Sequence, residues 1–199
     1  MNQVKLLKTK NNMKLKDKKV AILATDGFEK SELFEPLNAL KNEGAQVDII
    51  SVKEGEIKSW DGDNWGETIS VDKLVDDANV YDYNSLLLPG GVANPDLLRT
   101  HDKAIDFIRA FFKASKPVAA ICHAPWLLIS AKVIENRKVT SYHSIKDDVV
   151  NAGANWVNEE VVVDEGLVTS RNPKDLPAFI AKVIEEIREG KHEGQVVNA

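Results

Sequence analysis

A cysteine followed at once by a histidine is the pair of residues in this chain best suited to covalent chemistry. Cys122 is the only cysteine among 199 residues, and with His123 it separates the apolar run PVAAI (117–121) from the helix-like segment APWLLISAKVI (124–134). A thiolate is a nucleophile, and an imidazole can carry its proton. The alternative is a core residue, because free cysteine is among the most buried residue types.

A strand that ends at Cys122 and passes directly into a helix must turn sharply there. Such an elbow presents the nucleophile in α/β hydrolases. The N-terminal end of the following helix would lower the pKa of the thiol, and the backbone N–H of His123 would face a developing oxyanion. On pattern alone, the reactive thiol and the core residue are evenly balanced.

The elements that must position this pair alternate along the chain between apolar strands and amphipathic helices. Strands are predicted at 19–24, 46–52, 85–91, 117–122 and 138–142, with two more flanking a turn at 164–166, and helices within 26–44 and at 104–116, 124–134 and 174–189. The segment 54–72 is predicted to be an irregular loop. This alternation predicts an α/β single-domain sandwich with a mostly parallel central sheet and helices on both faces.

The composition and the chain ends limit the classes of function. The domain is predicted at 19–190, after a flexible Lys-rich extension (1–18, with Met13 as an alternative start) and before a tail (191–199). A net charge of −5 without a basic patch argues against nucleic acid as a partner, and no apolar run reaches the roughly 18 residues of a membrane span. A single cysteine fits a cytoplasmic protein. Neither a metal nor another cofactor is expected, because clustered cysteines and HxxH spacing are missing.

Two further segments are predicted to meet Cys122 where the parallel strands end. Ligands bind at the carboxyl ends of such strands. Glu29 and Glu32 follow the first strand, and Gly90 and Gly91 follow the third. The acids could instead stabilise the start of a helix, and the glycines could simply permit a tight turn.

Five segments together resemble the PfpI family of the class I glutamine-amidotransferase-like superfamily, which includes the parkinsonism-associated deglycase. They are DGFEKSELFEP (26–36), LLLPGGVANPDLLR (86–99), PVAAICHAP (117–125), TSYHSIKDDVVNAGANWV (140–157) and EVVVDEGLVTSRNPKDL (160–176). The resemblance covers about residues 19–188. It implies a flavodoxin-like fold and a homo-oligomer, a dimer or larger.

The resemblance also implies roles for individual residues. Cys122 would be the nucleophile, His123 the general base, and Glu32, four residues before Pro36, a protonated acid beside the thiol. The backbone N–H groups of Gly91 and His123 would form the oxyanion hole.

The resemblance also implies that Asp96 is an acid reaching the His of a neighbouring subunit and that Tyr142 lies in the pocket. Glu29 is the second candidate acid. Trp60 and Trp65 lie in the 54–72 loop, which departs from PfpI, and could line the pocket or anchor the loop. For Asp96 the alternative is a helix N-terminal residue, and for the aromatics it is a structural role.

The function implied is that of a cysteine-dependent hydrolase with a stress-protective role. Its substrate would be a reactive dicarbonyl or a dicarbonyl adduct on a protein, amine or thiol, as in deglycases and glyoxalases, or a peptide bond, as in intracellular peptidases. The alternative is a non-enzymatic redox sensor or stress-holding chaperone that acts through oxidation of Cys122. Glutamine hydrolysis is disfavoured, because Asn172 stands where related amidotransferases have histidine.

Overall fold

The computed structural model describes residues 13–195 and is built around a seven-stranded sheet. The strand order is β11-β12-β8-β7-β1-β3-β6, and every neighbouring pair is parallel except β11 with β12. The strands are β1 (Lys19–Leu23), β3 (Gln46–Ser51), β6 (Lys73–Leu74), β7 (Ser85–Leu88), β8 (Val118–Ile121), β11 (Val161–Asp164) and β12 (Leu167–Ser170).

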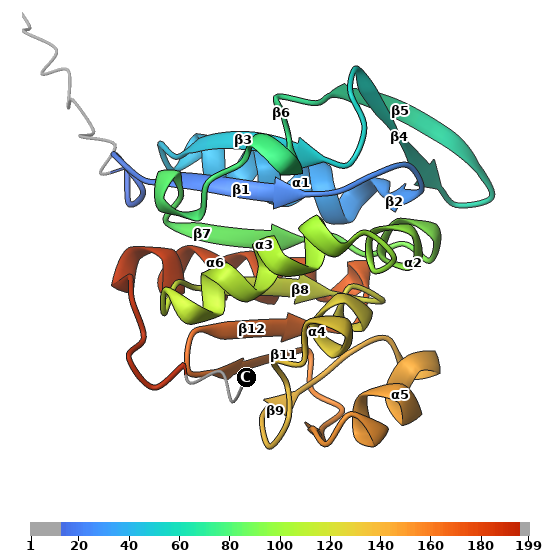
Figure 1. Cartoon of the computed structure of the whole chain (residues 1–199), viewed down its shortest axis with the longest axis vertical. Helices are drawn as coiled ribbons and strands as arrows, with labels where there is room; N and C mark the ends of the chain where they lie inside the picture. Colours follow the sequence, from blue (N-terminus) through green and yellow to red (C-terminus); the bar gives the residue numbers. More distant parts are fainter. Residues whose placement is uncertain (1–12, 196–199) are drawn as a thin grey trace, which may run out of the picture.

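Helices cover both faces of this sheet, which confirms the predicted fold class. α3 (Asp102–Lys113) and α4 (Pro125–Ala131) pack on one face, and α1 (Lys30–Asn42) and α6 (Leu176–Glu189) pack on the other (Figure 1). The pattern in α3 explains its placement, because its buried residues recur every three or four positions and so form one apolar stripe.

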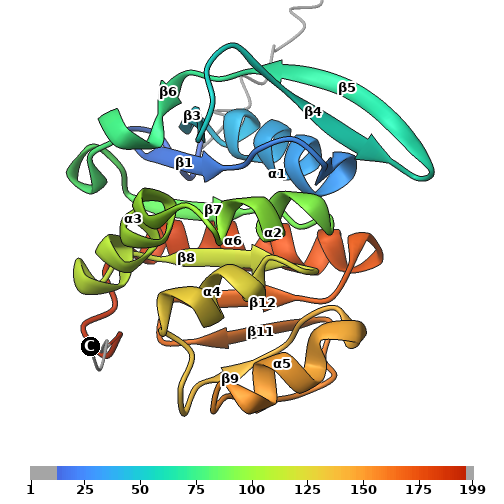
Figure 2. The same ribbon diagram turned by 45° about the vertical axis from the view of Figure 1, so that its right-hand side comes forward.

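The two central strands bring distant segments of the chain together. β7 (SLLL) and β8 (VAAI) are buried along their whole length and pair in parallel, with Leu88 opposite Ala120. The segments that follow them therefore leave the sheet side by side, as Figure 2 shows for the chain running into α2 (Ala93–Leu98) and α4. Gly90 lies in the segment after β7, and Cys122 lies in the segment after β8.

The prediction of an irregular loop at 54–72 is wrong. β4 (Glu56–Asp61) and β5 (Asn64–Ser70) form an antiparallel hairpin at the edge of the molecule, and β2 (Phe28–Glu29) pairs in parallel with β4 (Figure 2). The two-residue turn that joins β4 to β5 begins at Gly62, which has φ +62°. The apolar alternation that marks a strand is weak here because β5 carries exposed side chains on both faces.

The region after α4 is also less regular than predicted. α4 ends at Ala131, before Lys132 with φ +58°, and the strand expected at 138–142 is reduced to β9 (Lys138–Val139). β9 pairs with β10 (Asn155–Trp156), and the chain that connects these two strands contains α5 (Lys146–Asn151). The segment 140–145 thus turns away from the strand and back over Cys122.

Both described chain ends pack on the domain. Leu15 is fully buried and its N–H donates to the Glu43 carbonyl at 2.9 Å, so the expected flexibility is wrong for residues 13–18. In the expected tail, the N–H of His192 donates to the Ser115 carbonyl and Gln195 is buried. The rest of the extension (1–12) and of the tail (196–199) lies outside the described residues. Within 13–195 no helix is long and apolar enough to cross a membrane.

Candidate active site

Cys122 occupies a strained turn directly after β8. Its φ is +64°, a region that non-glycine residues seldom adopt. The neighbouring segments fix this backbone, because the Cys122 N–H donates to the Ser170 carbonyl at 3.0 Å and the Cys122 carbonyl accepts from the Tyr142 N–H at 2.8 Å. Such strain costs on the order of 1–3 kcal/mol and clusters at functional sites. The predicted elbow is therefore present, although the side chain is only 6% exposed.

His123 contacts the thiol with its side chain as well as following it in sequence. Its Nδ1 lies 3.1 Å from the Cys122 sulfur, and its Nε2 lies 3.1 Å from Ser144 Oγ. Burial lowers the pKa of His123, with a smaller contribution from His143. The ring is therefore neutral at pH 7, and when Nε2–H donates to Ser144, the lone pair of Nδ1 faces the thiol.

Aromatic neighbours hold the His123 ring in place. Tyr142, a predicted pocket residue, stacks on it with centroids 4.7 Å apart, and Trp126 packs at 5.3 Å. The Trp126 indole N–H in turn donates to Asp148 at 2.8 Å. Trp126 and Ser144 were not among the predicted site residues. Trp126 reaches the ring from the first turn of α4, three residues after His123. Ser144 reaches it only because the chain after β9 folds back, and residue spacing carries no signal of that.

Glu32 is the acid beside the thiol. It is fully buried, and its Oε2 accepts a hydrogen bond from the Gly90 N–H at 2.8 Å. A Cβ added at Gly90 would fall 2.5 Å from that oxygen and 2.7 Å from the Cys122 Cβ. Glycine at this position therefore lets the carboxyl and the cysteine approach each other. The second oxygen, Oε1, has no hydrogen-bond partner within residues 13–195.

The two groups titrate as a coupled pair. Burial raises the pKa of Glu32 to about 8, with help from the charge of Glu29 and against the Gly90 hydrogen bond. Burial also raises the pKa of the Cys122 thiol, and an ionised Glu32 raises it further. Because each ionisation disfavours the other, the pair first gains one negative charge, which it shares.

The lowered thiol pKa expected from the sequence is therefore wrong. Burial of the sulfur is the largest cause of the raised pKa, and α4 has only seven residues to supply an opposing dipole. Two hydrogen bonds act in the opposite direction, because the backbone N–H groups of Gly91 and His123 both lower the pKa of Cys122. These amides face the sulfur; that they also donate to an oxyanion on a substrate remains a prediction.

Gly91 also needs to be glycine for steric reasons. Its φ is +80°, and a Cβ there would collide with the backbone of the Gly27–Glu29 segment. The tight turn and the amide facing the sulfur are thus both properties of the same residue, so the two alternatives raised by the sequence are compatible.

The remaining predicted residues lie farther from the sulfur. Glu29 caps α1, accepting from the Glu32 N–H at 2.8 Å and from Ser31 Oγ at 2.6 Å. Asp96 is exposed in the first turn of α2. Trp60 and Trp65 lie on the β4–β5 hairpin, 39% and 53% exposed, and pack edge to face at 5.5 Å. Of the two glutamates, Glu32 rather than Glu29 therefore lies beside the thiol.

The sequence is similar to a known family and to proteins that carry names. The sequence model of the DJ-1/PfpI family matches residues 18–186. Deglycase TK1284 of Thermococcus kodakarensis is 44% identical over 170 residues, which are 85% of this chain and 99% of that protein. General stress protein 18 of Bacillus subtilis is 46% identical over 163 residues, 81% of this chain and 93% of that protein.

A solved structure supports the same assignment. It is a two-domain protein from Anabaena variabilis that contains dj-1/thij/pfpi-like and ferritin-like domains. It superposes with a TM-score of 0.81 at 31% identity, over 85% of this chain and 48% of that longer one. With the family match over most of its length, the chain belongs to the DJ-1/PfpI family.

Proposed function

We propose that this protein is a cysteine-dependent hydrolase that acts on reactive dicarbonyls and on their adducts with amines and thiols. The observation that carries the proposal is the 3.1 Å contact between the Cys122 sulfur and His123 Nδ1, beside the buried Glu32. The names of two relatives support it, one a deglycase and the other a general stress protein.

In the first step the Cys122 sulfur attacks the aldehyde carbon of the dicarbonyl. His123 Nδ1 takes the thiol proton, since a buried thiol with a raised pKa needs a base next to it. The carbonyl electrons move to oxygen, where the N–H groups of Gly91 and His123 donate. One such donor changes turnover by about 100- to 1000-fold in known oxyanion holes.

The overall reaction needs no external oxidant. His123 first returns the thiol proton to the oxyanion, which gives a hemithioacetal. It then takes the C–H proton of that carbon, and the electron pair of the broken C–H bond passes to the neighbouring carbonyl, which is protonated on oxygen and receives the proton back on carbon. The first carbon is thereby oxidised to a thioester of Cys122, and the neighbouring ketone carbon is reduced to an alcohol. One water molecule hydrolyses the enzyme thioester, which frees the sulfur. With an adduct, the sulfur replaces the amine or thiol on the same carbon: the bond from that carbon to Cys122 forms, the bond to the amine or thiol breaks, and the leaving group takes the thiol proton from His123.

Glu32 and Ser144 prepare the two reacting side chains. Protonated Glu32 offers an O–H donor next to the sulfur, and its pKa of about 8 keeps it protonated at neutral pH. Such a donor stabilises the thiolate as it forms. Ser144 fixes which nitrogen of His123 carries the proton.

The test is turnover of methylglyoxal and of a methylglyoxal adduct of an acetylated lysine, by the wild type and by Cys122→Ser. We expect the wild type to consume the dicarbonyl, to form lactate and to free the lysine, and the variant to lose at least about 1000-fold in rate. A fluorogenic peptide assayed in parallel tests the peptidase alternative. Hydrolysis of the peptide without dicarbonyl turnover would reject the dicarbonyl substrate.

A redox function is the second candidate, and the Glu32 carboxyl oxygen that has no hydrogen-bond partner within residues 13–195 favours it. Two molecules of hydrogen peroxide would convert the thiol to a sulfinic acid and release two of water. The unpartnered Glu32 Oε1 could then donate to the new oxygen atoms. A wild type that gains two oxygen atoms on Cys122 at low peroxide, with no turnover of any carbonyl substrate, would favour this function.

The assembly and location of the protein are also proposals. We expect a homo-oligomer in the cytoplasm, with a small electrophile or peptide as its other partner. Asp96 is exposed and so is free to reach a neighbouring subunit. Light scattering during gel filtration measures the assembly, and Asp96→Asn should lower turnover only if that carboxylate supports a partner's histidine.

A further inference from the structure

A second group of side chains with metal-ligand chemistry lies far from Cys122 in the fold. Glu186 and Glu189 stand on the last turn of α6, and His192 follows the helix. Potential ligand atoms of all three lie within 4.8 Å of one another. Glu186 is 6% exposed, whereas Glu189 is at the surface, so the group has one buried and one open side.

The local chain path brings His192 back to the helix. α6 ends at Gly190, which has φ +97° and whose N–H donates to the Glu186 carbonyl at 2.9 Å. The N–H of His192 then donates to the Ser115 carbonyl at 2.9 Å. The ring lies against Gly166, where a Cβ would fall 2.6 Å from it. The imidazole is thus held in place before any ligand binds.

The buried atoms of this group lack the hydrogen bonds that such atoms normally have. Within residues 13–195, neither Glu186 Oε2 nor His192 Nε2 has a hydrogen-bond partner. The two atoms are 2.9 Å apart, yet they are not aligned as donor and acceptor. Two ligands bound tetrahedrally to one zinc ion at about 2.0–2.2 Å each lie about 3.3–3.6 Å apart, so these two atoms need to separate by only about half an ångström. Their spacing and misalignment therefore fit two lone pairs that converge on a shared cation.

The electrostatics of the site also favour a cation. Glu186 is buried and its Oε2 has no hydrogen-bond partner within residues 13–195, so a carboxylate charge there lacks full compensation in the protein alone. The C-terminal end of α6 adds negative partial charge. The nearby cation Lys182 is already paired with Glu185 at 2.7 Å.

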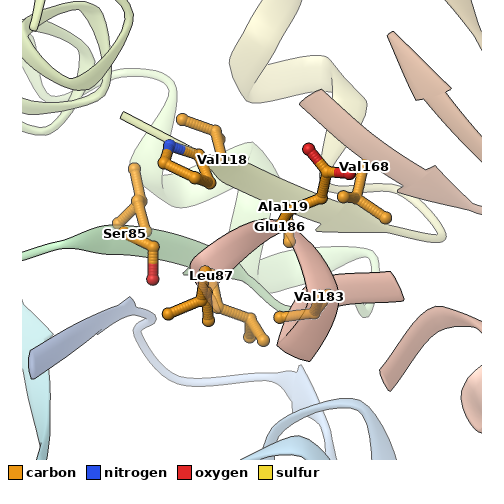
Figure 3. Close-up of a pocket in the computed structure, with 10 residues that line it drawn as sticks. Ser85, Leu87, Val118, Ala119, Val168, Val183 and Glu186 are labelled. Atoms are coloured by element: carbon orange, nitrogen blue, oxygen red, sulfur yellow. The ribbon is translucent and has the colours of Figure 1, made fainter. Parts of the chain in front are cut away.

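The space beside Glu186 excludes an organic ligand. The gap between α6 and the first residues of β7 and β8 measures about 10 Å³, no more than one water molecule fills. Figure 3 shows the Glu186 carboxyl extending away from Leu87 and Val183, which line that gap. On the side away from this gap, the Glu186 carboxyl contacts the imidazole of His192.

We propose that Glu186, Glu189 and His192 bind one divalent transition-metal ion, with Zn²⁺ as the best match to two carboxylates and one imidazole. Water completes the coordination shell. The ion ties the chain after α6 to the helix, so it stabilises the fold rather than the reacting groups. This inference is independent of the function proposed for Cys122.

The experiment measures metal binding to tag-free protein in a Cys122→Ser background, which removes the thiol as a competing ligand. Zinc is titrated calorimetrically, and Co²⁺ is added as a spectroscopic probe, because four-coordinate cobalt absorbs visible light strongly. We expect one zinc per chain, a visible cobalt spectrum and a higher Tm with metal. Glu186→Gln and His192→Ala should each weaken binding at least tenfold.

Two further variants keep the test decisive. Glu185→Gln removes a neighbouring carboxylate that is not a proposed ligand, so it should bind zinc like its parent. Glu189→Gln changes an exposed residue that the fold does not need, so its binding defect would report coordination alone. The proposal is overturned if the parent takes up no stoichiometric zinc, or if Glu189→Gln and His192→Ala bind it unchanged. Glu186 and His192 would then be a simple ion pair.

Discussion

Glu32 and Glu186 are buried on the same face of the sheet but at opposite ends of the same two strands. Glu32 on α1 meets Gly90 and Cys122, where β7 and β8 end. Glu186 on α6 lies where β7 and β8 begin, beside Ser85 and Pro117. Burial raises the pKa of both carboxyls. Because burial is common to both, any difference between the roles of the two side chains must come from the groups around them.

The difference lies in the backbone donors that each strand end supplies. At the carboxyl end, the turn at Gly90 leaves an N–H free to bond Glu32. At the amino end, Pro117 has no N–H, and the Leu86 N–H already donates to the Pro117 carbonyl. Glu186 meets an imidazole instead. The same burial thus favours a protonated carboxyl beside the thiol at one end and, in the site proposed above, a bound cation at the other.

The largest expected effect comes from closing the gap between Glu32 and Cys122. Gly90→Ala places a methyl group 2.5–2.7 Å from both side chains, so both must move. We expect turnover of methylglyoxal to fall about 100-fold or more, and stability to fall by about 1–3 kcal/mol. Gly62→Ala, in the hairpin turn where nothing lies within 4 Å, is the control and should retain turnover. Equal activity in the two variants would mean that the approach at Gly90 is not needed.

The next effect is on stability and follows from the raised pKa of Glu32. In the unfolded chain this carboxyl ionises near 4.5, whereas in the folded protein its pKa is about 8. The folded state therefore holds the extra proton between these values, and stability falls as pH rises from 5 to 8. Each unit of pKa difference corresponds to about 1.4 kcal/mol, so we expect a loss of a few kcal/mol.

Urea unfolding at pH 5 and pH 8 measures this loss. Glu32→Gln should flatten the pH dependence, because its amide does not ionise. Glu186→Gln should flatten it less, and Glu35→Gln, an exposed position on the same helix α1, should leave it as in the wild type. If Glu32→Gln keeps the wild-type slope, the carboxyl is not protonated in the folded protein.

A smaller effect is expected at Ser144, which touches His123 but no substrate. Ser144→Ala frees His123 Nε2 and lets the other tautomer form, so kcat should fall about three- to tenfold with little change in KM. The pH profile of kcat should shift as well. Ser144→Thr keeps a hydroxyl and should restore most of the rate. A loss that threonine does not restore would point to packing rather than to the hydrogen bond.

Much of the Cys122 end of the molecule could be predicted from the sequence. Strands that are apolar throughout carry a strong local signal, as β7 and β8 do, and the residues after them could be assigned to one edge of the sheet. The resemblance to a known family then singled out Glu32 over Glu29. The contact between the Cys122 and His123 side chains could not be predicted, because it depends on the φ of +64°.

Features built from long-range packing escaped prediction. The hairpin at β4–β5 lacks a buried face, and Ser144 reaches His123 through a fold-back that no spacing reveals. The group around Glu186 was missed for a related reason. A search for HxxH spacing cannot find an imidazole that returns to its helix through a glycine turn at Gly190.

Cys122 and Glu32 titrate as one unit, which is uncharged at neutral pH and gains a single negative charge near pH 8. The most direct measurement is the rate of Cys122 alkylation by iodoacetamide from pH 5 to pH 10, in the wild type and in Glu32→Gln. We predict that the wild-type rate levels off near pH 8, where the carboxyl competes for the charge. The Glu32→Gln rate should keep rising, because only the thiol ionises. Two superimposable profiles would contradict the account.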